Sequence, residues 1–206
     1  MTRIYLIRHG RTALNAQGRF RGLEDPPLDE MGLAEARWAS ARLAGAGLAI
    51  VYASPLQRAL GTARIVAGLA GTPVEIARDL VDLDYGRWTG LTLEEAERVD
   101  PEGFALFRND PERATPPGGE PVRRMADRVV RAIQRIAAQH AGAAAAAVSH
   151  ELPIRFLIGR SRRSDGRSTW RVQVPTGSVT VIDVFPQSME VLLRQEPPAA
   201  GPEEGG

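Results

Sequence analysis

The sequence predicts an α/β fold, a three-layer α/β/α sandwich with a mostly parallel central sheet. Short apolar runs of strand length alternate along the chain with longer segments in which apolar residues recur at helical spacing. Such alternation is typical of a parallel sheet covered on both faces. A length of 206 residues with 43% hydrophobic residues suits one domain with a sizeable core. We expect this domain to span residues 1–196, followed by a disordered Pro/Gly/Glu-rich tail at 197–206.

Turn residues and apolar runs mark the elements in the first part of the chain. The first apolar run ends at charged residues, and the helical pattern after it stops at Gly45 and Gly47. Ser54 and Pro55 begin the next helix, with Ser54 as its N-cap and Pro55 at its first position. The expected order is a strand at Thr2–Ile7, a helix at Leu28–Gly45, a strand at Leu48–Ala53, a helix at Pro55–Ala70 and a strand at Thr72–Ile76.

A loop at Asp79–Leu91, with two glycines and a tryptophan, separates these elements from the rest. Beyond it, helical spacing and apolar alternation again indicate the element type. The expected order is helices at Thr92–Val99, Pro101–Phe107 and Pro121–His140, a strand at Ala143–Ser149, a helix at Glu151–Ile158, and strands at Trp170–Val174, Ser178–Phe185 and Glu190–Arg194.

Composition excludes several classes of function. The net charge of +1 favours neither nucleic acid nor a membrane as the main partner. No secretory signal is found, and the apolar run Ala143–Val148 is too short to span a bilayer, so we expect a cytoplasmic protein. The absence of cysteine excludes disulfides, thiolate metal sites and a cysteine nucleophile. All 26 basic residues are arginine, which excludes a Schiff-base lysine and a Walker-type lysine.

Chemically active residues follow the ends of several expected strands. Arg8, His9 and Gly10 come after the first strand, Arg58 lies in the first turn of the helix after the second, and His150 follows a later strand. If these strands are parallel neighbours, the side chains share one edge of the sheet, where open α/β folds bind ligands. An imidazole beside arginines and a helix N-terminus suits a phosphoryl group. The competing interpretations are a surface arginine for Arg58 and a structural histidine for His150.

In order and spacing, the motifs resemble the histidine phosphatase superfamily, which includes cofactor-dependent phosphoglycerate mutases and many small-molecule phosphatases. The resemblance covers Thr2 to about Phe185. The matching stretches are Leu6–Thr12, Asn15, Gly18–Gly22, Pro27-Leu28, Gly32, Ser54–Leu56, Arg58-Ala59, Thr62-Ala63, Asp84–Gly86, Trp88, Gly90, Gly118–Glu120, Val148–His150 and Ile154-Arg155.

The resemblance implies a role for each site residue. His9 would be the nucleophile that forms a phosphohistidine, and Arg8, Arg58 and His150 would line the phosphate pocket. Asn15, Arg21 and Gly22 would contact or border the substrate, although the family often has glutamine where Arg21 stands. The implied partner is a small phosphorylated metabolite, with no metal and no cofactor. The oligomeric state stays open, a homodimer included.

The leaving oxygen needs a proton donor, and two aspartates compete for that role. Alignment on Tyr85-Gly86 puts Asp82 where the family commonly has a glutamate, so Asp82 is preferred over Asp84. The structural alternative is a solvated Asp82 that pairs with Arg78 or Arg87. Glu151 stands where glycine is frequent in the family, and we expect it to point to solvent rather than raise the pKa of His150. We interpret the remaining charged features as solvated. They are His140 and the cluster of Arg160, Arg162, Arg163, Arg167 and Arg171.

The sequence therefore predicts a metal-independent phosphatase of small phosphomonoesters. A phosphoglycerate mutase is the alternative, but the short segment after Tyr85-Gly86 and the absence of lysine disfavour it. A non-catalytic phospho-ligand-binding module conflicts with the complete set of site residues. An aspartyl-phosphate motif at Asp82-Leu83-Asp84 lacks the preceding strand and the following hydroxyl residue.

Overall fold

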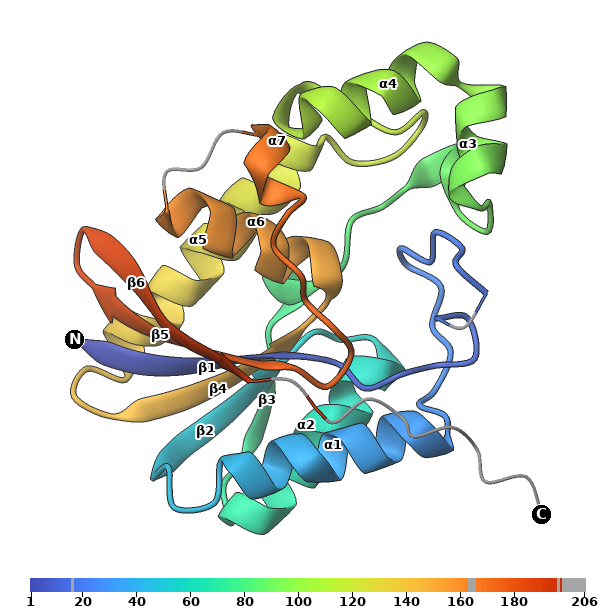
Figure 1. Cartoon of the computed structure of the whole chain (residues 1–206). Coiled ribbons are helices and arrows are strands. Elements are labelled where there is room, and N and C mark those ends of the chain that lie inside the picture. Colours follow the sequence, from blue (N-terminus) through green and yellow to red (C-terminus); the bar gives the residue numbers. More distant parts are fainter. Residues whose placement is uncertain (16, 163–165, 196, 198–206) are drawn as a thin grey trace.

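The computed structural model describes residues 1–15, 17–162, 166–195 and 197 and shows a sheet of six strands in the order β3-β2-β4-β1-β5-β6 (Figure 1). Strands β3, β2, β4 and β1 are parallel, whereas β5 and β6 are antiparallel additions at one edge. The predicted mostly parallel α/β sandwich is confirmed. The strands are β1 (Thr2–Arg8), β2 (Leu48–Ala53), β3 (Val74–Ile76), β4 (Ala144–Ser149), β5 (Val179–Phe185) and β6 (Ser188–Gln195).

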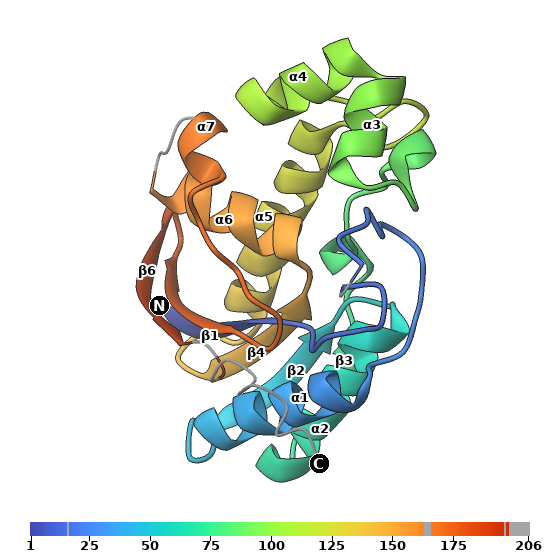
Figure 2. The ribbon, with the colours of Figure 1, turned by 45° about the vertical axis from the view of Figure 1, so that its right-hand side comes forward.

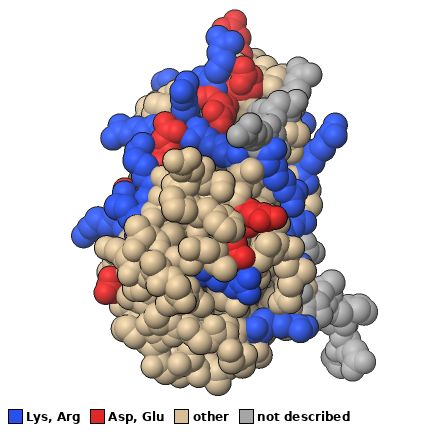
Figure 3. All heavy atoms as spheres, turned by 90° about the vertical axis from the view of Figure 1, so that its left-hand side faces the viewer, with Lys and Arg blue, Asp and Glu red and all other residues tan. Residues whose placement is uncertain are grey.

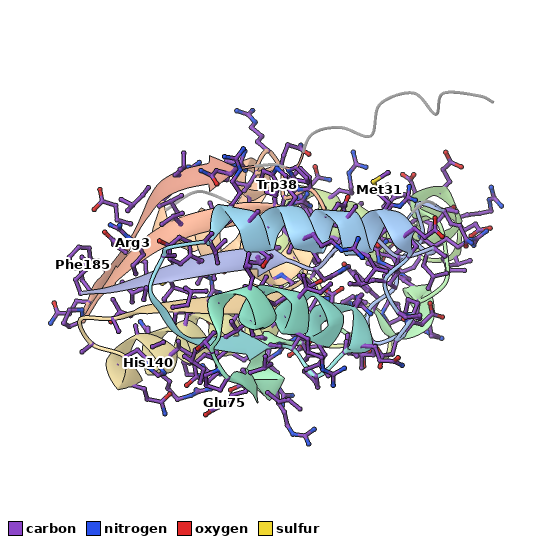
Figure 4. The ribbon with its side chains drawn as sticks, turned by 90° about the horizontal axis from the view of Figure 1, so that it is seen from below. Arg3, Met31, Trp38, Glu75, His140 and Phe185 are labelled. Carbon is purple, nitrogen blue, oxygen red and sulfur yellow. The ribbon has the colours of Figure 1, made fainter. Side chains whose placement is uncertain are left out.

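Helices cover both faces of the sheet. Figure 1 shows α1 and α2 on the lower face and α5 and α6 on the upper face, and Figure 4 shows α1 and α2 side by side in front of the sheet. Each layer encloses its own apolar core, with Ile7, Val51 and Val148 facing one and Ile4, Leu6 and Ala147 facing the other. The helices are α1 (Glu30–Arg42), α2 (Gln57–Ala70), α3 (Leu93–Val99), α4 (Pro101–Asn109), α5 (Val122–Gln139), α6 (Glu151–Ser161) and α7 (Gly166–Thr169).

Three short helices extend the upper layer away from the sheet. Figure 2 shows α3, α4 and α7 together at the top, with the loop that follows β1 rising beneath α3. Arg19 in this loop forms an isolated bridge with Thr92, and Phe20 and Leu91 share a backbone hydrogen bond of 2.9 Å. The loop and the short helices therefore stand together above the carboxyl ends of the parallel strands.

The expected strand at Trp170–Val174 is wrong. This segment has a turn followed by irregular backbone, and arginine side chains take the place of a neighbouring strand. The carbonyls of Val172, Gln173 and Val174 accept hydrogen bonds from three of them, Arg155, Arg194 and Arg8. Apolar alternation alone does not distinguish such a strap from a strand, because both expose backbone groups that must find partners.

The second helix also begins later than predicted. Leu56 is the N-cap of α2, and the helix starts at Gln57. The Ser54 hydroxyl lies 2.7 Å from Nε2 of His150 and accepts a long hydrogen bond of 3.4 Å from the N–H of Leu56, but it caps no N–H within α2. The main partner of the Ser54 side chain is thus a residue 96 positions further along the chain. The local sequence signals of a helix start do not indicate such a partner.

Two side chains that we expected to be solvated, those of His140 and Arg160, instead form contacts with other side chains. His140 follows α5 half-buried, and its Nε2 lies 3.0 Å from the hydroxyl of Tyr52. Arg160 lies in α6 and forms ion pairs with Glu112 and Asp127. Arg162 and Arg171 are exposed as expected, whereas Arg163 and the side chain of Arg167 lie outside the described residues, as does the predicted tail apart from Pro197.

None of the described helices combines the length and apolar composition that a membrane crossing requires. The face on the left of Figure 1 carries arginines and carboxylates interspersed over its upper part, and its lower part has few charges (Figure 3). Charges of both signs therefore lie together on this face.

Replacing Gly32 with alanine should destabilise the fold. A Cβ at Gly32 would lie 2.0 Å from the carbonyl oxygen of Arg11, where the chain leaving β1 crosses the first turn of α1. This backbone contact cannot relax by a side-chain rotation, so we expect the free energy of unfolding to fall by about 2 kcal/mol in urea titrations. Gly68→Ala is the matched control. Gly68 also lies in a helix, nothing lies within 4 Å of an added Cβ, and we expect a gain of about 0.5–1 kcal/mol. Equal effects of the two substitutions would contradict this.

Candidate active site

The carboxyl ends of three adjacent parallel strands bring the predicted site residues together. The backbone N–H of His9, after β1, donates to Ser149 of β4 at 3.0 Å, and that of Ser54, after β2, donates to Val148 at 3.0 Å. His150 directly follows β4. The sheet register thus fixes these backbones, and the two imidazole centroids lie 5.0 Å apart at 58°. The predicted convergence of His9 and His150 at one sheet edge is present.

The His9 ring is held as a neutral imidazole. Its Nδ1 lies 2.7 Å from the carbonyl oxygen of Gly10, which can only accept, so Nδ1 carries the proton. Nε2 then has a lone pair, and it accepts from Nε–H of Arg58 at 3.2 Å. Burial, followed by the charges of Arg58 and Arg8, holds the pKa of His9 well below its ordinary value. The unprotonated Nε2 is the form that a nucleophile needs.

His150 is fully buried beside it. Its Nε2 shares a hydrogen bond with the hydroxyl of Ser54, and its Nδ1 is buried with no partner among the described residues. Burial and then Arg58 lower its pKa well below the ordinary value. A buried ring nitrogen without a partner is costly unless a ligand or water meets it, so His150 suits a role toward a bound anion.

Arg58 is completely buried, which excludes a surface arginine. It extends from the first turn of α2 and donates to the carbonyls of Gly22, at 2.9 Å, and Glu24. The Nη2 atom of Arg58 also lies 3.7 Å from a carboxylate oxygen of Asp82. Arg58 therefore ties the loop after β1 to the centre of the site, and its Nε–H places a cation against Nε2 of His9.

Arg8 is also buried and is fixed along one side of its guanidinium. Nη1 donates to the carbonyl of Val174 at 2.6 Å and lies 2.8 Å from Glu151, whereas Nε has no partner among the described residues. The unpartnered Nε–H leaves Arg8 with donor capacity for a phosphate oxygen.

Asp82 lies in the site, whereas the Asp84 side chain stabilises a backbone turn. The Asp82 carboxylate is buried and accepts from its neighbour Leu83 at 2.9 Å, while Arg78 and Arg87 are exposed and are not its partners. Burial raises the pKa of Asp82 and the nearby Arg58 only partly offsets it, which favours the protonated acid. Asp84 instead accepts from the backbone of Gly86 at 2.9 Å.

Arg128 is a residue that the sequence analysis missed. Its guanidinium, on α5, donates to the carbonyls of Asp79, Val81 and Asp82 at 2.6–2.8 Å and pairs with Glu120 at 2.8 Å. These bonds hold the segment that carries the Asp82 carboxylate. On sequence Arg128 is one of several arginines of an amphipathic helix, so only the fold distinguishes it.

The expectation that Glu151 points to solvent is wrong. Its carboxylate lies 2.8 Å from Arg8 and 2.5 Å from Arg155. Burial would raise the pKa of Glu151, but the two arginines outweigh it and hold the pKa below its usual value. Glu151 therefore acts on Arg8 and not on the imidazole of His150.

A pocket of about 610 Å³ adjoins this centre at Arg8 and Asp82, whereas His9, Arg58 and His150 are buried and do not line it. Arg8, Asn15, Arg21 and Asp82 line it, whereas Gly22 is buried. Asn15 accepts from the backbone and hydroxyl of Thr12, at 2.9 and 2.8 Å. The site thus combines buried imidazoles and arginines with an open pocket, a combination that suits a phosphate ester. Within the part of the chain that the structure describes, no three His, Asp or Glu side chains are placed to hold a metal ion.

Comparison with known proteins agrees with this chemistry. A family model described as Histidine phosphatase superfamily (branch 1) matches residues 4–196. The chain is 36% identical over 185 residues to the Bifunctional protein Rv2228c of Mycobacterium tuberculosis, which covers 89% of this chain and 50% of that protein. The chain therefore spans about half the length of the first curated relatives that it matches.

Two further relatives are matched over nearly their whole length. The chain is 30% identical to the Adenosylcobalamin/alpha-ribazole phosphatase of Escherichia coli, over 88% of this chain and 90% of that enzyme. The solved structure of Bacillus stearothermophilus YhfR superposes with a TM-score of 0.86 at 32% identity, covering 93% of this chain and 95% of that one.

Proposed function

The chain belongs to the histidine phosphatase superfamily, and on that premise we propose that it hydrolyses small-molecule phosphomonoesters through a phosphohistidine on His9, without a metal. The observation that carries this proposal is the His9 ring. Its Nδ1 proton is bound by the Gly10 carbonyl and its Nε2 lone pair lies against a buried arginine. The ring therefore presents an unprotonated Nε2, the atom that would act as nucleophile, inside a cationic site.

The first step transfers the phosphoryl group to the enzyme. His9 Nε2 attacks phosphorus and the ester P–O bond breaks, while Arg8 and Arg58 offset the charge on the phosphoryl oxygens and His150 hydrogen-bonds to them. Asn15, Arg21 and Gly22 border the bound substrate. Asp82 gives its proton to the leaving alkoxide, so a neutral alcohol departs.

The second step returns the enzyme to its starting state. The Asp82 carboxylate takes a proton from water, the water oxygen attacks phosphorus, and the P–N bond breaks to release inorganic phosphate. The imidazole of His9 recovers its lone pair and Asp82 is again protonated. Splitting the hydrolysis into two displacements lowers each barrier.

Hydrolysis of p-nitrophenyl phosphate with and without EDTA tests the proposal. We expect turnover that EDTA does not change, because the buried arginines Arg8 and Arg58 supply the positive charge that a metal would otherwise supply. Loss of turnover in EDTA, restored by a divalent ion, would contradict it. Incubation with 3-phosphoglycerate and 2,3-bisphosphoglycerate should release inorganic phosphate; accumulation of 2-phosphoglycerate would instead support a mutase.

A further inference from the structure

Glu151 brings a negative charge to a site that otherwise suits an anion. Two acidic side chains line the pocket, Asp82 and Glu151. Burial raises the pKa of Asp82. Burial acts in the same direction on Glu151, but Arg8 and Arg155, with a smaller effect of Arg21, outweigh it and hold its pKa below the usual value. At neutral pH the Glu151 carboxylate is therefore ionised beside the place where a phosphate would bind.

The Glu151 carboxylate is fixed through both of its oxygens. Oε2 lies 2.8 Å from Nη1 of Arg8, and Oε1 lies 2.5 Å from Nη2 of Arg155, one turn further along α6. The two arginines are in turn anchored to the segment after α7, where Val174 accepts from Arg8 at 2.6 Å and Val172 accepts from Arg155 at 2.9 Å. Moving the carboxylate away from an incoming anion would therefore break two ion pairs.

Arg8 divides its donors between Glu151 and the site. Its Nη1 is occupied by Glu151 and by the Val174 carbonyl, whereas its buried Nε has no partner among the described residues. A phosphate oxygen that accepts from this Nε–H would share one guanidinium with the carboxylate. Solvent screens the repulsion between the two anions only weakly, because the Arg8 side chain is 8% exposed.

Two effects of Glu151 on Arg8 oppose each other. Its hydrogen bond orients the guanidinium, which favours phosphate binding, and its charge repels phosphate. Arg8 does not depend on Glu151 alone for its orientation, because the Val174 carbonyl binds the same Nη1. The charge is therefore the larger effect, and it is the part that a neutral side chain of the same shape would remove.

We propose that Glu151 weakens the binding of phosphate at Arg8 and thereby lets inorganic phosphate leave after each turnover. The proposal rests on the proposed function, which makes inorganic phosphate the second product. Glu151 is then a positioning residue that acts through Arg8. The repulsion raises the free energy of every state that carries a phosphoryl group in the site, so it lowers affinity for substrate and product alike.

Glu151→Gln tests the charge at constant shape, because the amide oxygen can still accept from Arg8. Calorimetric titration with inorganic phosphate at about pH 8.5, where phosphate is mainly a dianion, should give a dissociation constant about tenfold lower than that of the wild type. A dissociation constant does not change with the fraction of folded protein. Glu151→Gly, which removes the whole side chain, should shift the constant in the same direction. An unchanged or higher constant in both variants would overturn the proposal.

The charge of the ligand separates repulsion from a structural effect. At about pH 5.5 inorganic phosphate is mainly a monoanion, and Glu151 stays ionised because its pKa is below the usual value. The ratio of the wild-type and Glu151→Gln dissociation constants should therefore fall from about tenfold to about threefold, since the repulsion is proportional to the ligand charge. The same ratio at both pH values would mean that Glu151 acts through shape and would overturn the proposal.

Glu112→Gln is the matched control. Glu112 also pairs with an arginine of α6, Arg160 at 3.0 Å, and its side chain is 36% exposed against 29% for Glu151. Glu112 does not line the pocket, so its variant should change the dissociation constant less than twofold. A tenfold decrease in Glu112→Gln as well would mean that the net charge of the protein, and not the contact with Arg8, sets the affinity.

Binding and turnover together distinguish this proposal from the proposed function. Equal dissociation constants in the wild type and Glu151→Gln would overturn the role of Glu151 and leave the hydrolysis of esters unaffected. A tenfold difference in binding, with no hydrolysis of any ester by the wild type, would support the effect of Glu151 on phosphate and overturn the proposed function. Binding of phosphate to neither protein would overturn both.

Discussion

His9→Ala should abolish phosphatase turnover, lowering kcat on p-nitrophenyl phosphate by about 10⁴-fold or more. The ring nitrogen that accepts the phosphoryl group is then missing, and the arginines and His150 can bind substrate but cannot replace the covalent step. Rapid quenching with radiolabelled substrate gives a second readout. The wild type should yield a base-stable, acid-labile phosphoryl adduct, and the variant none.

His140→Ala is the control for a lost imidazole. His140 bonds to Tyr52 at the far end of α5, outside the site, so its removal should leave kcat and the adduct essentially unchanged. Turnover by His9→Ala within tenfold of the wild type, or an adduct that persists in it, would contradict a phosphohistidine on His9.

Asp82→Asn should impair esters with poor leaving groups much more than p-nitrophenyl phosphate. An alkoxide needs the proton that Asp82 supplies, whereas p-nitrophenolate leaves without it. We expect a loss of about 10²–10³-fold in kcat on an alkyl phosphate such as glycerol 3-phosphate, within the usual range for general acid catalysis. The loss on p-nitrophenyl phosphate should be less than about tenfold, since the charged groups of the site remain.

The pH dependence of alkyl phosphate hydrolysis tests the same role of Asp82 as proton donor. The protonated form of Asp82 is the proton donor, and burial raises its pKa above the ordinary value. The activity on an alkyl phosphate should therefore be present below that raised pKa and decline as the pH rises through it. This decline should be absent from Asp82→Asn. An identical alkaline limb in the variant would mean that another group titrates.

Asp84→Asn distinguishes the two aspartates. The Asp84 carboxylate accepts a backbone hydrogen bond from Gly86, so its amide variant should affect both classes of ester alike. A selective loss on the alkyl ester in Asp84→Asn, and not in Asp82→Asn, would reverse the assignment.

The sequence was sufficient for the elements that have strong local signals. The β2 prediction matches Leu48–Ala53 in full, and β1 and β4 each differ by one residue from the expected ranges. The convergence of His9, Arg58 and His150 was also predictable. It follows from the polarity of parallel strands, whose carboxyl ends meet at one edge.

Partners distant in sequence account for the parts that could not be predicted. Ser54 has the character of an N-cap, yet it bonds to His150. The Trp170–Val174 segment has the apolar alternation of a strand, yet arginines from β1, α6 and β6 bind its carbonyls. Glu151 suits a helix N-terminus on local grounds, yet it joins Arg8 to Arg155.

The sequence by itself determined the order of strands and helices, the chemical groups at the strand ends and the family to which they belong, because these depend on local periodicity and on residue type. Only the tertiary structure decided which arginines reach the centre, how Arg128 holds the Asp82 segment, and that Phe20, Tyr85 and Phe107 meet beside it. The physical reason is that burial and long-range hydrogen bonding set the pKa, orientation and partner of each side chain, and these arise only when distant segments pack together.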